Sequence, residues 1–455
     1  MANNLPIDDL RAGIHGAVLT AGDDGYDEAR RVFYPGYDYS PAAVVRAAGA
    51  EDVIRAVNFA RQAGLELAVR SGAHSLAGHG VSQGGLVIDL SMMKDLDIDL
   101  DKKTAWAQSG LTGGEYTRIA AEHGLATGFG DTASVGIGGL TLGGGIGYLV
   151  RQYGLTIDNL LAAEIVTADG QLRRVDAENE PDLFWAIRGG GGNFGVITRF
   201  QFQLHPVDHI VGGMLILPAT PEVIYGFIQA AEAAPEELST IANIMQSPPM
   251  PFLPEEVHGK MILMGMLAYN GDAAAGQRVL APFRALAEPL ADMVTPTRYM
   301  DLFPDEEQEF PTAADITRTV YLNRFGLSDA QTVVDFLEAS SAPMRVVQLR
   351  VLGGAMARIA NDATAYAHRD RPYMAAVAAL YDDLSETDQH EAWVTSFVEA
   401  LPTGRPGAYV NFLGNEGQDR VRAAYPGGHW ERLREIKARY DPDNLFRLNQ
   451  NIPPA

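Results

Sequence analysis

The chain has 455 residues, of which 47% are hydrophobic and 20% charged, and its formal net charge is −23 at pH 7. This length predicts two or three domains, and the composition is that of a globular protein. The negative charge argues against a nucleic-acid partner, because a phosphate backbone would be repelled. The sequence shows no apolar run of membrane-spanning length and no secretory signal, so we expect a cytoplasmic protein without a membrane partner.

The chain contains no cysteine. Disulfides, iron–sulfur clusters, thiolate zinc sites and cysteine nucleophiles are therefore excluded. The ten histidines lack the spacing of a metal-binding helix, so we predict no metal site.

Strand and helix patterns alternate through the first 207 residues. Residues 40–92 fit a strand–helix–strand unit followed by a further strand, because an apolar helical stripe ends at Gly64 between strand-like runs. The elements expected here are strands at 43–46, 66–70, 85–90, 104–109, 160–168, 172–175 and 196–204, and helices at 51–63, 112–123 and 182–187.

Residues 128–147 hold nine glycines in twenty positions, interleaved with bulky apolar residues such as Val135 and Ile137. Ordering so many glycines costs much conformational entropy, and flexible linkers lack such apolar residues. The segment therefore predicts a backbone that lies against a ligand.

A second glycine pattern spans Gly190, Gly192 and Gly195, which match the GxGxxG spacing of dinucleotide sites. That fingerprint requires a strand before it and a helix after it. Here a helical pattern precedes and a strand pattern follows, so we reject a classical Rossmann site.

The pattern of predicted elements changes after Pro206, where strands and longer helices alternate in an α+β pattern. We expect an antiparallel sheet covered on one face by helices. The elements expected are strands at 211–217, 260–269, 317–325, 344–352 and 408–413, helices at 221–237, 272–289, 328–340, 387–400, 416–424 and 427–439, and a proline-rich loop at 248–254.

The loop Arg70-Ser71-Gly72-Ala73-His74-Ser75 directly follows a predicted strand. Its successive backbone N–H groups could form an anion-binding nest for a pyrophosphate, to which Arg70 would add charge. A lone histidine in such a loop is more often a structural hydrogen-bonding residue than a catalytic one, so both interpretations stay open on the residues alone.

Four segments together resemble a known family: RSGAHS, ASVGIGGLTLGGGIGYLVRQYGLTIDN, EPDLFWAIRGGGGNFGVIT and YDPDNLFRLNQNIPP. They are similar to the berberine-bridge-enzyme-like FAD-linked oxidases, which share the FAD fold of vanillyl-alcohol oxidase. The resemblance implies an α+β chain with a two-subdomain PCMH-type FAD-binding domain at 1–207. A substrate-binding domain with a helix-covered antiparallel sheet would follow at 208–405, and a segment at 406–455 would return to the FAD domain.

The resemblance also implies the cofactor site. His74 matches the histidine bonded to the flavin 8α-methyl carbon, and Ser71 to Ser75 would surround the pyrophosphate. Many members add a second bond from a cysteine, but that position is Thr132 here, which implies a single attachment. The remaining cofactor positions implied are Arg70, Val135, Gly136, Gly138, Gly139, Gly143, Gly144, Gly145, Gly147, Gly195, Val196, Ile197, Asn411, Asn449 and Asn451.

The chain departs from the family's catalytic tyrosine motif, because it reads Tyr409-Val410-Asn411-Phe412 and has phenylalanine at the position of the catalytic tyrosine. Phenylalanine cannot accept a proton. Tyr409 is the nearest candidate base, although strand alternation would point it away from position 412. Four further candidates lie in the predicted substrate domain, each more often a packing residue than a base: Tyr321, Tyr366, His368 and Tyr381.

The expected activity is oxidation of a small organic substrate, such as an alcohol, sugar or specialised metabolite. Substrate hydride would pass to flavin N5 and then, as electrons, to O2 to give hydrogen peroxide. Val135, at the family's oxygen-gating position, favours this. Two alternatives stay open: a flavin enzyme for oxidative cyclisation, desaturation or redox-neutral rearrangement, and a redox-silent FAD-binding protein.

Overall fold

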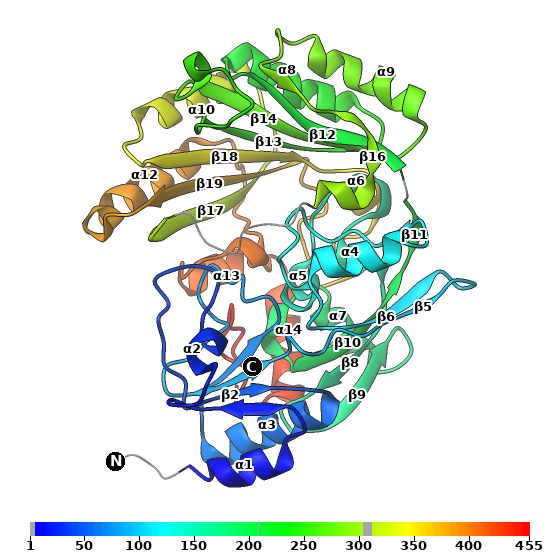
Figure 1. Cartoon of the computed structure of the whole chain (residues 1–455), viewed down its shortest axis with the longest axis vertical. Helices are drawn as coiled ribbons and strands as arrows, with labels where there is room; N and C mark the ends of the chain where they lie inside the picture. The colour runs from blue at the N-terminus through cyan, green and yellow to red at the C-terminus, as the bar shows by residue number, and fades with distance from the viewer. Residues whose placement is uncertain (1–4, 208, 304–311) are drawn as a thin grey trace.

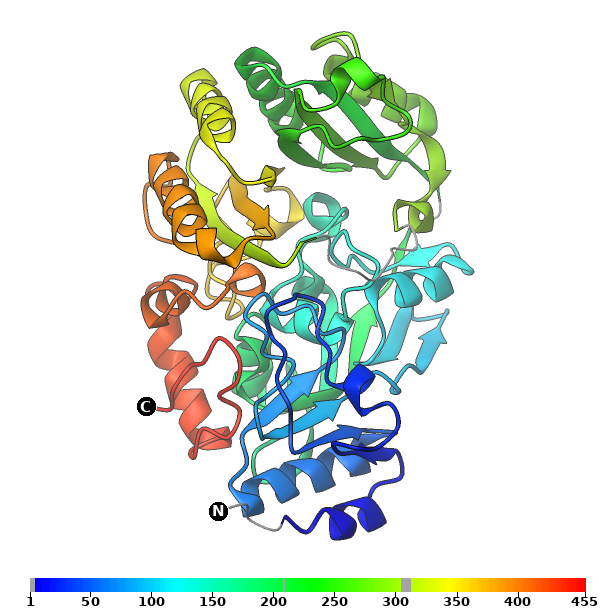
Figure 2. The same ribbon diagram turned by 60° about the vertical axis from the view of Figure 1, so that its left-hand side comes forward.

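The computed structural model describes residues 5–207, 209–303 and 312–455. Two parts are stacked on each other in Figure 1. The first half of the chain forms the lower part around two sheets, and the middle of the chain forms the upper part around one larger sheet. The C-terminal segment runs back down beside the lower part, as the turned view in Figure 2 also shows.

The first sheet has four strands in the order β1 (Ala17–Leu19), β2 (Ala43–Arg46), β4 (Leu86–Asp89) and β3 (Leu67–Arg70). Strands β2 and β3 run parallel to β4. Helix α3 (Ala50–Ala63) buries Val53 and Val57 against this sheet and ends at Gly64, which has the left-handed φ of 63°. The strand–helix–strand prediction is therefore confirmed, whereas α1 (Ile7–Gly13), β1 and α2 (Tyr26–Ala29) were not predicted.

The second sheet is wholly antiparallel, in the order β5 (Leu96–Asp99), β6 (Thr104–Gln108), β10 (Val196–Gln203), β8 (Leu160–Val166) and β9 (Leu172–Asp176). Helix α4 (Gly113–Ala121) begins at a capping box in which Thr112 and Glu115 satisfy each other's backbone N–H groups. A short pair joins β7 (Leu125–Ala126) to β11 (His205–Pro206).

The glycine-rich segment forms a helix, α5 (Ile137–Gly143), which glycine content alone does not predict. Short helices follow it at α6 (Val150–Tyr153), η1 (Thr156–Asn159), α7 (Pro181–Ile187) and η2 (Gly191–Asn193). Since α7 precedes the GxGxxG segment and β10 follows it, the rejection of a Rossmann site is confirmed.

The upper part is built on an antiparallel sheet of eight strands. Its strands are β12 (His209–Pro218), β13 (Leu238–Gln246), β14 (Met261–Tyr269), β15 (Ala291–Asp292), β16 (Thr295–Arg298), β17 (Ala314–Leu322), β18 (Met344–Val351) and β19 (Tyr373–Tyr381). Sequence patterns missed β13 and β19. The run Ala375 to Ala379 of β19 is rich in alanine, a residue with low β-propensity, yet it lies between β17 and β18.

Helices cover one face of this sheet, as predicted, and the other face looks down on the lower part (Figure 1). The covering helices are α8 (Pro221–Ala233), α9 (Ala273–Arg284), α10 (Leu327–Ala339) and α12 (Thr387–Ala400). Short elements connect them at η3 (Glu255–Val257), η4 (Tyr299–Leu302), α11 (Ala355–Arg358) and η5 (Leu384–Glu386).

The C-terminal segment packs on the lower part through α13 (Gln418–Ala423) and α14 (His429–Tyr440). Lys437 is fully buried there, pairs with Asp441 at 2.7 Å and donates to the backbone oxygen of Asn193 at 2.6 Å. The strand predicted at 408–413 is wrong: η6 (Val410–Phe412) is a single 3-10 turn, which removes the strand alternation used to orient Tyr409.

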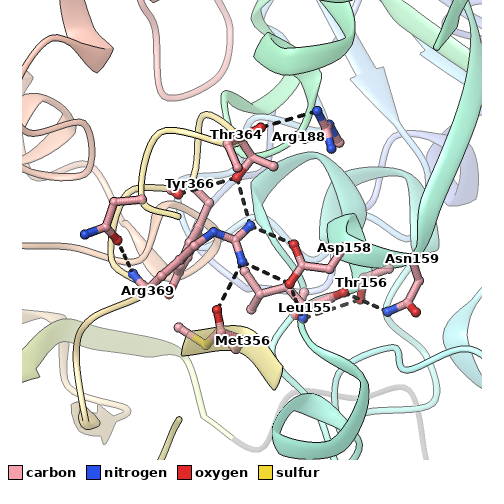
Figure 3. Close-up of polar contacts among 12 residues, drawn as sticks. Leu155, Thr156, Asp158, Asn159, Arg188, Met356, Thr364, Tyr366 and Arg369 are labelled. Atoms are coloured by element: carbon pink, nitrogen blue, oxygen red, sulfur yellow. Dashed lines mark hydrogen bonds and ion pairs between the residues drawn. The ribbon is translucent and has the colours of Figure 1, made fainter. Parts of the chain in front are cut away.

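A buried ion pair joins the two parts beneath the large sheet (Figure 3). The two guanidinium nitrogens of Arg369 meet the two carboxylate oxygens of Asp158 at 2.7 and 3.0 Å. Arg369 also donates to the Thr364 hydroxyl at 2.9 Å. Both charged side chains are at most 4% exposed, so this bidentate contact fixes the upper part against η1.

Candidate functional site

A cavity of about 790 Å³ runs through the lower part and opens toward the large sheet. Its size is that of a small-molecule or cofactor site. Loops from distant parts of the chain line it: 33–34, 70–76, 130–142, 191–197, 409–413 and 446–450. The sequence motifs that we singled out therefore converge on one place.

The two predicted backbone loops touch at the cavity floor. A Cβ atom built on Gly72 would lie 2.2 Å from the backbone nitrogen of Gly136, and one on Gly136 would lie 2.2 Å from that of Gly72. The Ser71 hydroxyl donates to the backbone oxygen of Ser109 at 2.6 Å. The two glycines thus let the loops approach closely and leave bare backbone facing the cavity.

His74 lies in the cavity wall on the first of these loops. Its ring stacks on Phe33 with centroids 4.0 Å apart, and Ala73 before it adopts a left-handed φ of 61°. Burial lowers the pKa of His74 to about 4, although a hydrogen bond to the Ser134 backbone opposes this shift. The imidazole is therefore neutral near pH 7.

Arg70 also lines the cavity, and it forms an ion pair within the protein. Its guanidinium pairs with the buried Asp89 at 2.6 Å and donates to the backbone oxygen of Arg31 at 2.8 Å. Arg46 also contacts Asp89, at 3.6 Å, so one carboxylate faces two guanidinium groups, and a contribution of Arg70 to pyrophosphate binding stays a prediction.

Tyr409, Asn411 and Phe412 all face the cavity. The Tyr409 hydroxyl oxygen accepts hydrogen bonds from the Gly145 backbone N–H at 2.9 Å and from the Asn411 amide at 3.0 Å. Its ring packs edge-on against Phe412, with centroids 5.2 Å apart. The expectation that Tyr409 points away from position 412 is therefore wrong, because the 3-10 turn brings both side chains to one side.

Several other predicted positions line the cavity as well. They are Ser75, Thr132, Val135, Gly138, Gly139, Gly195, Val196, Ile197 and Asn449. Gln450 lines it too, whereas its neighbour Asn451 does not.

The glycines at 143, 144, 145 and 147 do not line the cavity. Neighbouring protein atoms lie so close to them that a side chain would not fit. A Cβ on Gly143 would lie 1.9 Å from the Asn411 side-chain oxygen, and one on Gly147 would lie 2.3 Å from the backbone oxygen of Gly130. Gly145 has a φ of 81°, and a Cβ built on it would lie 2.0 Å from the Thr156 hydroxyl oxygen. These close contacts explain the glycines at 143, 144, 145 and 147 without a ligand, and the expected cofactor contact at these four positions stays a prediction.

The alternative base candidates in the upper part lie outside the cavity lining. The Tyr321 and Tyr366 hydroxyls bond each other at 2.8 Å, and both rings contact the buried His368. The Tyr381 hydroxyl donates to Thr387, at the start of α12. All four are packing residues here.

Sequence reasoning missed the charged wall opposite His74. Arg350 on β18 pairs with Asp131 at 2.6 Å and donates to the Gln348 side chain at 2.7 Å, and all three line the cavity. Neither strand β18 nor its neighbours carry a local motif, so these residues are found only once the sheet is placed over the cavity. Tyr34 and His79 were also missed.

A second cavity of about 180 Å³ adjoins the first beneath the sheet. It shares Tyr34, Leu76, Gln348 and Phe412 with the large cavity. The remaining wall comes from the sheet itself: Asn243, Thr317, Val346, Ala376 and Ala378. The long cavity thus leads to a small chamber under the sheet.

The walls fit a flavin dinucleotide. Gly139 and Gly192 line the cavity, and a Cβ on either would meet nothing within 4 Å, so they leave room for a group lying flat on the backbone. The buried Ser109 hydroxyl and the Asn449 amide oxygen have no hydrogen-bond partner among the residues described. Because buried polar atoms are normally paired, both suit polar groups of a ligand in the cavity.

This fold and cavity define a flavin-nucleotide-binding oxidoreductase, and comparisons with known proteins agree. Residues 41–176 match the FAD binding domain family, and residues 408–453 match the family described as berberine and berberine like. An uncharacterised FAD-linked oxidoreductase of Bacillus subtilis, YgaK, is 31% identical over 96% of this chain and 97% of its own. The chain belongs to the berberine-bridge-enzyme-like FAD-linked oxidoreductases.

Two further relatives have named activities. The (R)-6-hydroxynicotine oxidase of Paenarthrobacter nicotinovorans is 27% identical over 97% of both chains. The crystal structure of 6-hydroxy-D-nicotine oxidase from Arthrobacter nicotinovorans superposes with a TM-score of 0.86 at 25% identity, covering 97% of this chain and 98% of that one. In the described part of the chain, no helix is long and apolar enough to cross a membrane.

Proposed function

We propose that this chain is an FAD-dependent oxidase of a small organic molecule, with FAD attached only through His74 and O2 as the electron acceptor. The observation that carries the proposal is the buried imidazole of His74, neutral near pH 7, in the wall of a cavity that is also lined by the glycine-rich loops. A neutral imidazole has the free lone pair that bond formation to a flavin methyl carbon requires.

The single attachment follows from the residue across the cavity. Thr132 lines the wall at the position of the family's second bond, and a hydroxyl lacks the nucleophilicity of a thiolate. The residues proposed to contact FAD are those that line the cavity: Ser71, Gly72, Ala73, Ser75, Val135, Gly136, Gly138, Gly139, Gly195, Val196, Ile197, Asn411 and Asn449.

FAD, when bound, accepts the substrate's hydride equivalent and passes its electrons to O2, while the protein supplies orientation and electrostatics. Tyr409 is the proposed proton-handling residue. Burial raises the pKa of Tyr409, although hydrogen bonds from Asn411 and the Gly145 backbone oppose this. The phenol is therefore protonated near neutral pH, and Tyr409 lines the cavity, so its O–H is proposed to act there as a hydrogen-bond donor.

The chamber under the sheet is the proposed substrate site. Phe412 lies at the junction of the two cavities, so a substrate in the chamber would sit beside the cofactor. The ion pair of Arg350 and Asp131 closes the same wall and keeps it electrically neutral. Val135 lines the large cavity and is proposed to admit oxygen to the flavin.

The proposal is tested by anaerobic reduction of the purified, FAD-replete protein with a panel of alcohols, amines and oligosaccharides. Loss of the flavin's visible absorbance, followed by one peroxide per oxidised product on adding air, is the expected result. A cyclised or desaturated product formed with one peroxide would favour the oxidative alternative, and a rearranged product formed without net bleaching or peroxide would favour the redox-neutral one. Neither bleaching nor product with any compound would favour a redox-silent FAD protein.

The variant Tyr409→Phe should lower the rate of reduction by about 10²-fold or more if Tyr409 takes part in proton transfer. Tyr321→Phe is its matched control, because that buried phenol bonds Tyr366 outside the cavity lining. Equal rates in both variants would remove Tyr409 from the reaction.

A further inference from the structure

The sheet face above the proposed substrate chamber carries a carboxylate, Asp315, that forms no ion pair with any residue that the structure describes. Residues on β17 alternate between the two faces: Val320 and Leu322 pack under the helices, whereas Thr317 lines the chamber. Asp315, two positions before Thr317, therefore lies on the same face of the sheet as the chamber, next to the lining residues rather than among them. The Thr317 hydroxyl donates to the Asp315 carboxylate at 3.2 Å.

Two phenols of the lower part approach this carboxylate from the opposite side. The charge of Asp315 contributes to raising the pKa of both Tyr34 and Tyr37, after the larger effect of burial. Tyr34 lines both cavities, so it connects Asp315 to the chamber.

Every other charged group of the two cavity walls is paired or neutral. Arg350 pairs with Asp131, and Arg70 pairs with Asp89. Burial lowers the pKa of both His74 and His79 to about 4, which leaves them uncharged near pH 7. These groups therefore leave no free cation at the cavity to balance a further carboxylate.

Asp315 itself has no ion-pair partner in the part of the chain that the structure describes. Burial raises the pKa of its carboxyl to about 6, the direction expected when a charge is desolvated without compensation. It still ionises near neutral pH, so it is a half-buried anion that a ligand's positive charge would stabilise.

The rest of the chamber is apolar or uncharged. Leu76, Val346, Ala376 and Ala378 form its walls with Phe412, and the polar residues Asn243, Thr317 and Gln348 carry no charge. Farther along the same sheet face, a partly buried patch is rich in flexible thioether side chains: Met214, Met245, Met250 and Met264. Such a surface suits a hydrophobic ligand body better than a sugar, which needs many hydrogen bonds.

We propose that Asp315 is the specificity-determining residue of the chamber and binds the protonated nitrogen of an otherwise apolar amine. The inference rests on the proposed function, because it names the substrate class of the same site. The carboxylate would hold the ammonium group at the mouth, with the rings of Tyr34 and Tyr37 beside it, where aromatic faces also attract cations. The apolar body would extend along the alanine-lined wall toward Phe412.

The test uses a matched pair of probes, phenethylamine and phenethyl alcohol, which share an aromatic body and differ in charge. Binding to the FAD-replete protein is measured near neutral pH by equilibrium dialysis, which requires no turnover. The variants are Asp315→Asn, which removes the charge, and Asp315→Glu, which keeps it. Glu338→Gln is the control, because it removes one negative charge from the exposed surface of α10, on the helix-covered side of the sheet.

Phenethylamine binding should weaken by about 10- to 100-fold in Asp315→Asn, the range for losing a hydrogen bond to a charged group. The alcohol should bind both proteins alike, Asp315→Glu should retain most amine binding, and Glu338→Gln should change neither probe. Equal weakening of both probes, unchanged amine binding in Asp315→Asn, or no amine binding to the wild type would each overturn the proposal.

The FAD content of the same samples separates this inference from the proposed function. Amine binding that depends on Asp315 in a protein unable to hold FAD would refute the oxidase and leave the amine site standing. Conversely, FAD-replete protein that oxidises substrates but binds the amine equally well in the wild type and in Asp315→Asn would refute the amine site alone.

Discussion

Replacing Gly72 by alanine tests whether the contact between the two backbone loops holds the cavity floor together. The added Cβ would lie 2.2 Å from the Gly136 nitrogen, 2.8 Å from its Cα and 3.0 Å from the Ser134 oxygen. Ordinary contacts begin near 3.4 Å, so one loop must move by about an ångström. All three atoms are backbone, and no side-chain rotation can relieve the overlap.

Overpacking of this kind costs about 1–3 kcal/mol. A domain of roughly 200 residues loses about 2–4 °C in Tm per kcal/mol, so Gly72→Ala should lower Tm by about 2–12 °C. It should also reduce FAD incorporation, because the displaced loop carries Ser71 and His74. Thermal unfolding followed by circular dichroism and the flavin-to-protein absorbance ratio measure the two effects.

Gly414→Ala is the matched control for this substitution. Its Cβ would meet only an Arg318 nitrogen at 4.0 Å, so its Tm and FAD content should match those of the wild type. A Gly72→Ala protein as stable and as rich in FAD as the control would refute the close contact between the loops.

Three further results are expected. Asp158→Asn leaves the buried Arg369 charge unpaired and should destabilise folding by about 3–5 kcal/mol in urea unfolding; a change as small as that of a surface pair would contradict the rigid junction. Burial lowers the pKa of His79 to about 4 and of His368 to about 3. Because both histidines have a lower pKa in the folded protein, their stabilising contribution is complete above the unfolded pKa of 6.5. It is lost as the pH falls from there through the folded pKa, at about 1.4 kcal/mol per pH unit for each histidine. A urea concentration at half-unfolding that stays constant as the pH is lowered from 6.5 to 4 would contradict this. Amine binding should strengthen as pH rises through about 6, where Asp315 ionises; a flat profile in equilibrium dialysis would exclude that carboxyl.

The sequence predicted the cofactor half of the site because its residues lie in local motifs. The loop at 70–75 follows a strand, and the glycine-rich segment interleaves apolar residues, so short-range patterns locate both. The sequence alone does not show that protein atoms crowd the glycines from Gly143 to Gly147, because a glycine indicates a close approach but not which group approaches.

The substrate half could not be predicted in the same way. Asp131 and Arg350 are in contact although they lie 219 positions apart in the sequence. The side of the sheet on which Asp315 lies is known only once strand β17 is placed. Strand β19, which forms the chamber wall with Ala376 and Ala378, was itself missed because alanine does not signal a strand. Tertiary placement therefore decides which residues line the chamber and the wall above it.

The most direct test of the account is whether flavin stays on the polypeptide through His74. Wild-type and His74→Ala proteins, both saturated with FAD, are denatured in acid, run on a denaturing gel and viewed under ultraviolet light. The account predicts a fluorescent band for the wild type and none for His74→Ala. A dark wild-type band from FAD-replete protein, or a fluorescent His74→Ala band, would contradict it.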